Sequence, residues 1–412
     1  METTVTPAPD PAVWGEDLVN RLIGSGHLRT PEIITAFRSI ERHRFLPGVA
    51  LQDACVDDAV AVKHDETGAM ISCISAPSIV ATQLEQLDAR PGHTILEAGA
   101  GTGYNAALLG RLVAPDGHVW TVDVDQDLVD GAQKNLAQAG ATNVQVVLGD
   151  GAAGLAEHAP YDRVQFTVDA GDIPPAILDQ LAPGGRLVIP MRIRGSISRS
   201  LAFERDGQTW RTVSTEMMTF VPLRKGVCND IRTMVDMSGE GDVRLETYSE
   251  QNVDREAIRT VLDQPPAEIY TGVKFRKGDS YQWLYLYLAY ALANGLSRMP
   301  GSRPGLIPNF GWGSMAALDD DTLAYLTKRE GEDEEGVFWQ IGVIGHGPRA
   351  ADLADQVATA IDEWDQSWGN NAPAPVFRMA VGDSINQLRG SEPRFVIDKA
   401  HSRLVVDWPR RN

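Results

Sequence analysis

The chain has 412 residues, 43% of them hydrophobic and 23% charged, which is ordinary for a globular protein and excludes a wholly disordered or fibrous chain. The 37 basic and 56 acidic side chains give a formal net charge of −19. A field of that sign repels nucleic-acid phosphates and anionic membrane surfaces, so we expect neither as a partner. The length predicts two or three domains.

Cysteines and histidines give no sign of a metal site or a disulfide framework. Cys55, Cys73 and Cys228 lack CxxC spacing, and the eight histidines lack zinc-ligand spacing, so we predict no metal. The N-terminus has no signal-peptide pattern, and the most apolar run, 283–293, is shorter than the roughly 20 residues that span a bilayer. We therefore predict a cytoplasmic protein in which 283–293 is a buried helix.

The first half of the chain reads as helices followed by alternating strands and helices. Residues 12–47 and 78–87 have helical spacing, and Thr30-Pro31 is typical of a helix start. From residue 94 the expected strands are 94–97, 118–122, 144–148, 163–168 and 186–190, and the expected helices are 104–112, 126–139 and 174–181. This alternation predicts an α/β fold with a doubly wound, Rossmann-like parallel sheet.

The remaining segments are less regular. A hairpin over 200–204 and 208–215 and a strand over 219–223 are expected to end a first domain at residue 225. Residues 226–412 read as a smaller α+β domain. Its expected helices are 256–262 and 350–364, its strands 336–344, 375–380, 394–397 and 403–406, and its loops 300–313 and 330–335.

A glycine-rich turn between a predicted strand and a predicted helix is the strongest local motif. Residues 95–104 read ILEAGAGTGY, with glycines at 99, 101 and 103. Glycines at this position let the backbone approach a ligand at the carboxyl edge of a sheet. The GxGxG spacing differs from the dinucleotide pattern GxGxxG, and a purely structural tight turn is the alternative interpretation.

Three acidic residues end the first three strands of the predicted sheet. Asp123 stands where a carboxylate accepts both ribose hydroxyls, and Asp150 where it accepts the amino group of an adenine. With Glu97 they form an adenosine site that has no phosphate-binding Lys or Arg. This combination favours S-adenosylmethionine over NAD or ATP as the cofactor; a surface position or a helix cap is the alternative for each acid taken singly.

Several segments between Leu18 and Leu223 resemble the protein-L-isoaspartate O-methyltransferase family. The matching segments are IERHRFLP at 40–47, ISAP at 74–77, the glycine turn at 95–104, VWTVD at 119–123, GDG at 149–151, YD at 161–162, IPP at 173–175, LAPGGRLVIP at 181–190 and FVPL at 220–223. The resemblance implies a class I methyltransferase domain over 1–225. It also implies transfer of a methyl group from S-adenosylmethionine to a peptide carboxylate.

The resemblance also implies roles for individual residues. Ser75 matches the catalytic-site serine of the family, and its alternative role is to cap the helix that follows Pro77. Thr167 and Asp169 are expected at the substrate, although Asp169 also suits a solvated loop. The expected cofactor residues are Ser72, Ile74, Glu97, Ala98, Gly99, Gly101, Thr102, Gly103, Tyr104, Asp123, Val124, Asp150 and Gly151.

The chemistry that the resemblance implies needs no general base. A carboxylate, with a pKa near ~4, is already a nucleophile at neutral pH, so the enzyme has to orient it and exclude water. The Ser75 hydroxyl would donate to the carboxylate. The next backbone amide can then attack the methyl ester and close a succinimide.

Two departures from the family pattern bear on the substrate. Residues 62–72 lack the family's Pro-Ile-Gly-x-Gly-Gln-Thr run, Cys73 replaces a threonine, and the chain continues far beyond Leu223. That extension resembles lanthipeptide-associated enzymes, which methylate an Asp in a cyclised precursor peptide and so lead to aspartimide or isoaspartate. We therefore expect such a peptide as partner, with 226–412 recognising it. The alternatives are general isoaspartyl repair and a non-catalytic, cofactor-bound scaffold.

Overall fold

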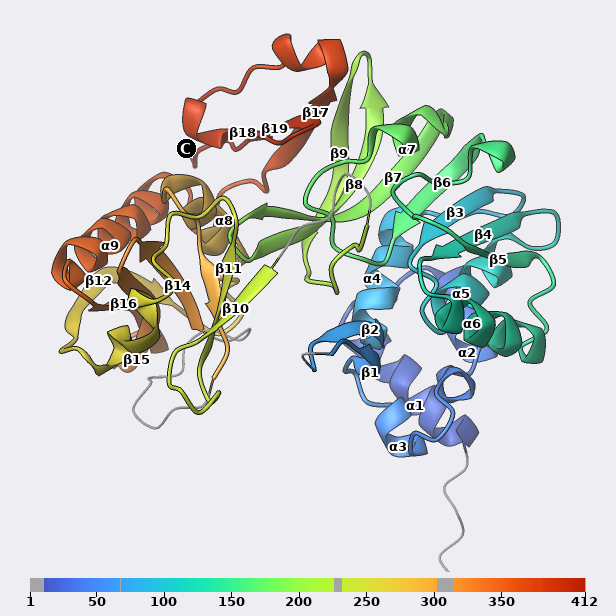
Figure 1. The fold of residues 1–412 in the computed structure, drawn as a ribbon, viewed down its shortest axis with the longest axis horizontal. Helices are drawn as coiled ribbons and strands as arrows, with labels where there is room; N and C mark the ends of the chain where they lie inside the picture. The colour runs from blue at the N-terminus through green and yellow to red at the C-terminus, as the bar shows by residue number, and fades with distance from the viewer. Residues whose placement is uncertain (1–10, 67, 226–231, 302–313, 412) are drawn as a thin grey trace, which may run out of the picture. The chain divides into compact units, whose positions relative to one another are not determined.

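The computed structural model describes residues 11–66, 68–225, 232–301 and 314–411 (Figure 1). The chain divides into two compact units. The first comprises Met1–Met191 and Ser200–Asn229, and the second comprises Arg192–Arg199 and Asp230–Asn412.

A central sheet organises the first unit, in the strand order β9-β8-β7-β6-β3-β4-β5. Strands β3 to β7 pair in parallel, which confirms the predicted α/β fold. Because β3 lies between β6 and β4, the strand order reverses at its carboxyl end, where ligands bind in folds of this kind. The strands are β3 (Thr94–Ala98), β4 (His118–Asp123), β5 (Val144–Leu148), β6 (Tyr161–Phe166), β7 (Leu181–Arg194), β8 (Ile197–Asp206) and β9 (Thr209–Met217).

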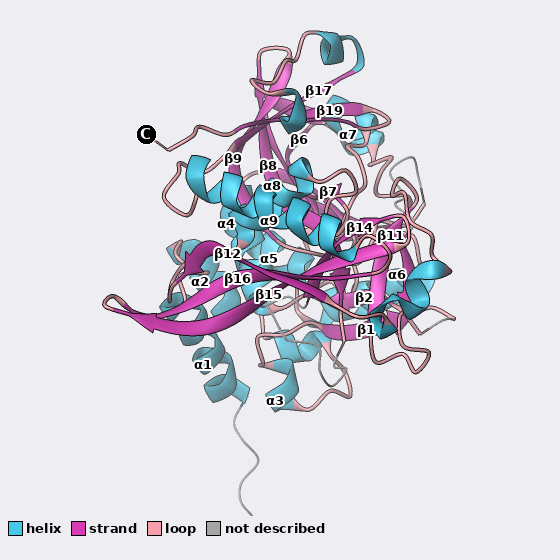
Figure 2. Cartoon of the chain, turned by 90° about the vertical axis from the view of Figure 1, so that its left-hand side faces the viewer, coloured by secondary structure: helices cyan, strands magenta, loops and turns pink. Residues whose placement is uncertain are grey.

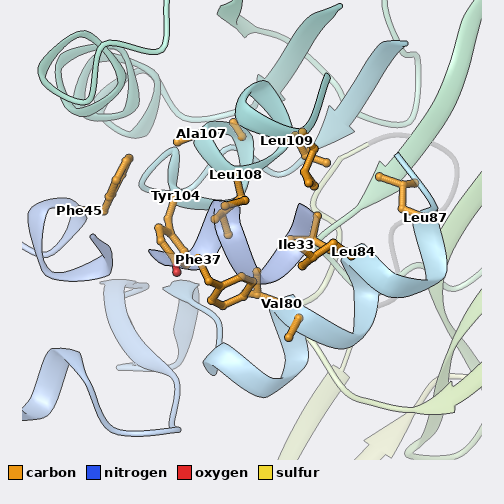
Figure 3. Packing of buried hydrophobic residues seen from close by; sticks show 14 of the residues in the cluster. Ile33, Phe37, Phe45, Val80, Leu84, Leu87, Tyr104, Ala107, Leu108 and Leu109 are labelled. Atoms are coloured by element: carbon orange, nitrogen blue, oxygen red, sulfur yellow. The ribbon is translucent and has the colours of Figure 1, made fainter. Parts of the chain in front are cut away.

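Helices of the first unit share one apolar core, in which Ile33, Val80, Leu84 and Leu108 are buried (Figure 3). They are buried because apolar residues recur at helical spacing on these helices, as predicted. The helices are α1 (Pro11–Gly24), α2 (Pro31–Ser39), α3 (Leu51–Ala54), α4 (Pro77–Leu87), α5 (Tyr104–Val113), α6 (Gln126–Gln138) and α7 (Pro175–Asp179), with 3-10 turns η1 (Arg42–Phe45) and η2 (Ala156–His158).

The N-terminal helices support the residue that follows the glycine turn. The rings of Phe37 and Phe45 pack edge-on against Tyr104, with centroids 6.4 Å and 5.4 Å away (Figure 3). Thr30 precedes α2 as predicted, but its hydroxyl does not cap the helix. It donates instead to Glu85 of α4, 2.8 Å away, because that carboxylate also accepts the Thr30 amide.

The first unit differs from the sequence prediction in two segments beside the sheet. A hairpin of β1 (Val60–His64) and β2 (Met70–Ile74) was not predicted, because its alternation of apolar and polar residues is weak. The predicted strand over 219–223 is not formed. That segment runs alongside Asp169 through a single parallel bridge at Pro222.

The second unit is built on an antiparallel sheet in the order β12-β16-β15-β14-β13. Helix α9 packs on β12, β15 and β16 (Figure 2), and the apolar run of α8 is buried as predicted. The strands are β10 (Arg232–Asp236), β11 (Arg244–Tyr248), β12 (Ala267–Phe275), β13 (Ser297–Met299), β14 (Ser314–Asp319), β15 (Thr322–Asp333), β16 (Gly336–His346), β17 (Val376–Val381), β18 (Val396–Asp398) and β19 (Ser402–Asp407). The helices are α8 (Gln282–Ala291) and α9 (Ala350–Ser367), with 3-10 turns η3 (Ala257–Asp263), η4 (Gly382–Asn386) and η5 (Pro393–Phe395).

Three expectations for the second unit need correction or cannot be compared. The expected helix over 256–262 is the 3-10 turn η3. Residues 330–335 are the tip of the β15–β16 hairpin rather than a loop, because the ladder continues to the pair Asp333 and Gly336. Of the expected loop over 300–313, residues 302–313 lie outside the described part of the chain, as does Cys228.

A search of the described residues for a helix long and apolar enough to cross a membrane finds none.

The core of the first unit predicts a matched pair of leucine variants. Leu108→Ala removes a fully buried side chain and should lower the free energy of unfolding by about 2–5 kcal/mol, because a cavity is left. Leu148→Ala, at a position 49% exposed, should cost well under half as much. Urea denaturation of the two variants checks this, and equal losses would contradict the packing described.

Candidate active site

The glycine turn connects β3 to α5 at the point where the strand order reverses. Gly99, Gly101 and Gly103 all have positive φ, at 105°, 50° and 85°. A Cβ on Gly99 would lie 2.4 Å from the Thr167 hydroxyl oxygen, so only glycine fits between the turn and the end of β6. Glycine is therefore favoured at 99 by the nearby Thr167 side chain, and at all three positions by the positive φ.

A pocket opens beside this turn, and most of the predicted site residues line it. It consists of two adjoining hollows, which have the lining residues Cys73, Gly99, Gly101 and Thr167 in common and are together called the pocket. Predicted residues along its walls are Ser72, Ile74, Ser75, Gly99, Gly101, Thr102, Tyr104, Asp123, Val124, Gly151 and Thr167. Lining residues that were not predicted include Cys73, Gln83, Asn105 and the segment 221–224.

Asp123 is the acidic residue that faces the pocket. One carboxylate oxygen accepts the Gly101 amide at 3.0 Å, and the other accepts the Asp125 amide at 3.3 Å. Only 8% of the residue is exposed, and this burial raises the pKa of Asp123. Each oxygen can accept a second hydrogen bond, so the carboxylate fits the two hydroxyls of a ribose.

Glu97 is the penultimate residue of β3, which ends at Ala98, one position beyond the predicted end of the strand; Glu97 is fully buried and does not line the pocket. Its two oxygens accept the Asn105 amide nitrogen, at 2.7 Å, and the Thr121 hydroxyl. Burial raises the pKa of Glu97 to about 7. The residue therefore supports the wall of the pocket from behind, through Asn105.

Four further predicted residues are placed around the pocket rather than on its walls. Ala98 accepts the Thr167 amide at 3.0 Å through its carbonyl, and Gly103 packs against α6, where a Cβ would lie 3.1 Å from Leu136. Asp150 precedes Gly151, and one of its oxygens accepts the Ala152 amide at 2.9 Å. Asp169 acts through its backbone.

The Asp169 backbone fixes the segment 221–224 at the mouth of the pocket. Its amide donates to the Val221 carbonyl at 2.9 Å, and its carbonyl accepts the Leu223 amide at 2.8 Å. The FVPL motif therefore forms one wall of the pocket. The pairing of this motif with Asp169 cannot be predicted from its apolar residues or from the position of Asp169 in a loop.

Ser75 lies between β2 and α4, where it lines the pocket. The residue that caps α4 is Ala76, so the alternative role of Ser75 as a helix cap is not observed. The buried guanidinium of Arg42 donates to the Ser75 carbonyl at 3.1 Å, and also to the carbonyls of Ala54 and Asp58. Arg42 thus fixes the backbone that carries Ser75, a role that sequence spacing alone does not indicate.

Among the described residues, no group of three or more His, Cys, Asp or Glu side chains is placed to hold a metal ion. Cys73 lines the pocket, and burial raises the pKa of its thiol, so the group stays protonated at neutral pH. The polar groups along this pocket are hydroxyls, backbone amides, the side-chain amides of Gln83 and Asn105, the Asp123 carboxylate and the Arg224 guanidinium.

Comparison with known proteins places this pocket in a family. The model of the protein-L-isoaspartate(D-aspartate) O-methyltransferase family matches residues 14–227, about half of the chain. The chain belongs to this family. A protein-L-isoaspartate O-methyltransferase of Methanopyrus kandleri is 43% identical over 177 residues, which cover 43% of this chain and 76% of that protein. One from Methanosarcina mazei is 39% identical over 201 residues, covering 48% and 79%.

A solved protein-L-isoaspartate O-methyltransferase aligns with 84% of this chain and 92% of its own, at 22% identity and a TM-score of 0.47. As a member of the family, the chain is a carboxyl O-methyltransferase that uses S-adenosylmethionine, which confirms the cofactor predicted from the strand-end acids. The family match ends at residue 227, so residues 230–412 of the second unit lie beyond it.

Burial of Glu97 predicts a pH-dependent stability that a neutral variant removes. Folding raises the pKa of Glu97 from 4.5 to about 7. The contribution of this group to the free energy of unfolding is therefore fully present below about pH 4.5 and is lost as the pH rises through 7. Glu97→Gln should match the parent near pH 4.5 and exceed it at pH 8 by about 3 kcal/mol. Thermal denaturation at both pH values checks this, and a constant difference between the proteins would contradict it.

Proposed function

We propose that the pocket beside the glycine turn binds S-adenosylmethionine and that the enzyme methylates the side-chain carboxylate of an isoaspartyl residue in a peptide or protein. The single observation that carries the proposal is that Ser75 and Asp123 line two adjoining hollows, which share Cys73, Gly99, Gly101 and Thr167. In this proposal Asp123 holds the ribose. The backbone of the glycine turn and the end of β2 hold the rest of the cofactor.

The residues present fit this cofactor, which supplies an electrophilic methyl group when bound. Glycines 99, 101 and 151 leave room along the floor, and Asp123 offers acceptors within an otherwise buried environment. Asp150 stands beside Gly151, where its carboxylate suits an adenine amino group.

Orientation of the substrate carboxylate is the main task left to the protein. A carboxylate is ionised at neutral pH, so no base has to remove a proton. The Ser75 hydroxyl donates a hydrogen bond to it and turns one oxygen toward the methyl donor, while Thr167 bounds the other side. The Arg42 contact keeps the Ser75 backbone from moving away from that position.

Two variants separate cofactor binding from orientation. Asp123→Ala should weaken S-adenosylhomocysteine binding by about 10- to 100-fold, the loss expected for hydrogen bonds to a charged acceptor. Ser75→Ala should keep that affinity and lower kcat by about 10- to 100-fold, because orientation alone is lost. Calorimetry measures the affinity for S-adenosylhomocysteine, and initial rates with an isoaspartyl peptide measure kcat. Unchanged affinity in Asp123→Ala would refute the ribose assignment, and unchanged kcat in Ser75→Ala the orienting role.

A second candidate function concerns the substrate. The relatives support isoaspartyl methylation, whereas the second unit favours a more specialised peptide. It adds a complete sheet with packed helices beyond the end of the family match. We propose, as this second candidate, that the unit recognises a cyclised precursor peptide of ribosomal origin, in which a normal Asp is methylated and then closes to aspartimide. A cytosolic location stays a prediction.

A panel of substrates distinguishes the candidates with the full chain. The panel holds a short isoaspartyl peptide, its normal aspartyl counterpart and a lanthionine-bridged peptide with an internal Asp. Repair predicts a methyl ester, about +14 Da, on the first peptide. Tailoring predicts that ester and then a net change of about −18 Da on the third. A scaffold that does not catalyse would leave all three unchanged, and Ser75→Ala is the control for catalysis.

A further inference from the structure

Two segments, which we call its covers, flank the pocket: the β1–β2 hairpin, which carries Ser72 and Cys73, and the segment 221–224. Both belong to the first unit, and both contribute residues to the pocket wall. They come from parts of the chain that are about 150 residues apart in the sequence. One acidic side chain, Asp125, binds a cation from each of them.

The contacts of Asp125 are direct. Its carboxylate accepts two hydrogen bonds from the Arg224 guanidinium, at 2.7 Å and 3.2 Å, and one from the Lys63 ammonium at 3.0 Å. Lys63 lies opposite Ser72 in the β1–β2 ladder, and Arg224 is itself the last residue of the wall segment 221–224. We call Lys63, Asp125 and Arg224 the rim clasp.

The rim clasp is only partly exposed, so its ion pairs are stronger than ordinary surface pairs. The exposed fraction is 18% for the Asp125 side chain, 29% for Lys63 and 30% for Arg224. The hydrogen bonds from Arg224 are the largest cause that holds the pKa of Asp125 below its usual value. Burial, the next largest, acts in the opposite direction. A bidentate arginine–carboxylate pair also fixes geometry, which a point charge does not.

The rim clasp is joined to the proposed ribose site through the backbone. The amide of Asp125 donates to Asp123, so the two carboxylates lie at one turn after β4. Lys63 is not among the residues that line the pocket. Lys63 therefore acts on a bound cofactor indirectly, by holding the hairpin to Asp125, and not by direct contact.

We propose that Asp125 is a positioning residue that holds both covers of the pocket in place and thereby sets how fast the cofactor product leaves. Release requires the hairpin and the segment 221–224 to separate, and separation breaks the ion pairs of Asp125. The inference rests on the proposed function, because it takes the pocket to be the cofactor site.

The test measures release of S-adenosylhomocysteine from the full chain by stopped-flow competition. Asp125→Asn should raise the dissociation rate about 5- to 20-fold at low salt and leave the KM for the peptide unchanged. Salt should accelerate release from the parent toward the rate of the variant, and should have little effect on the variant itself. The matched control is Asp127→Asn, because Asp127 pairs with Lys63 but, within the described part of the chain, not with Arg224, and it is 65% exposed; the dissociation rate of this variant should stay within about two-fold of the parent.

A double-mutant cycle separates the rim clasp from a merely structural effect. Lys63→Met should raise the dissociation rate in the parent but add nothing in Asp125→Asn, since the pair is already broken. Additive effects, or a dissociation rate in Asp125→Asn within two-fold of the parent, would overturn the proposal. Asp123→Ala in the same assay tests the cofactor site itself. If Asp123→Ala retains its affinity for S-adenosylhomocysteine, the proposed function is refuted. If Asp123→Ala loses that affinity while Asp125→Asn releases the ligand at the rate of the parent, only the rim clasp is refuted.

Discussion

The close approach of the glycine turn to the end of β6 is the constraint on which the rest of the site depends. With Gly99 against Thr167, the turn lies flat over the point where the strand order reverses. Its amides then reach the Val122 carbonyl and the Asp123 carboxylate. Because backbone hydrogen bonds fix this turn, it forms a defined floor against which the β1–β2 hairpin and the segment 221–224 build the walls of the pocket.

Sequence reasoning located the rigid part of this site and missed its covers. Strands β3 to β5 and helices α5 and α6 each have a local pattern of apolar residues, and that pattern alone predicts the type of secondary structure. The β1–β2 hairpin and the segment 221–224 are ordered by pairing with distant residues, such as Asp125 and Asp169. Such pairings leave no local period in the sequence, so the hairpin was not predicted and residues 219–223 were assigned to a strand.

The acids near the strand ends show that the sequence predicts the position of a residue better than the direction of its side chain. Glu97 is the penultimate residue of β3 and Asp123 is the last residue of β4, yet Glu97 is fully buried in a network with Thr121 and Asn105 while Asp123 faces the pocket. The sequence indicates that an acid stands at a strand end. The direction of its side chain depends on the register of the strand and on which polar groups the neighbouring elements supply.

The buried guanidinium of Arg42 has a consequence for where the catalytic unit begins. It binds carbonyl oxygens of Ala54, Asp58 and Ser75, so one side chain joins the N-terminal helices, the approach to β1 and the serine of the pocket. The Rossmann-like sheet with its glycine turn is therefore not a self-sufficient module in this chain. A shortened protein that starts at β3 would keep the glycine turn but lose Ser75 itself, together with the Arg42 side chain that binds its carbonyl.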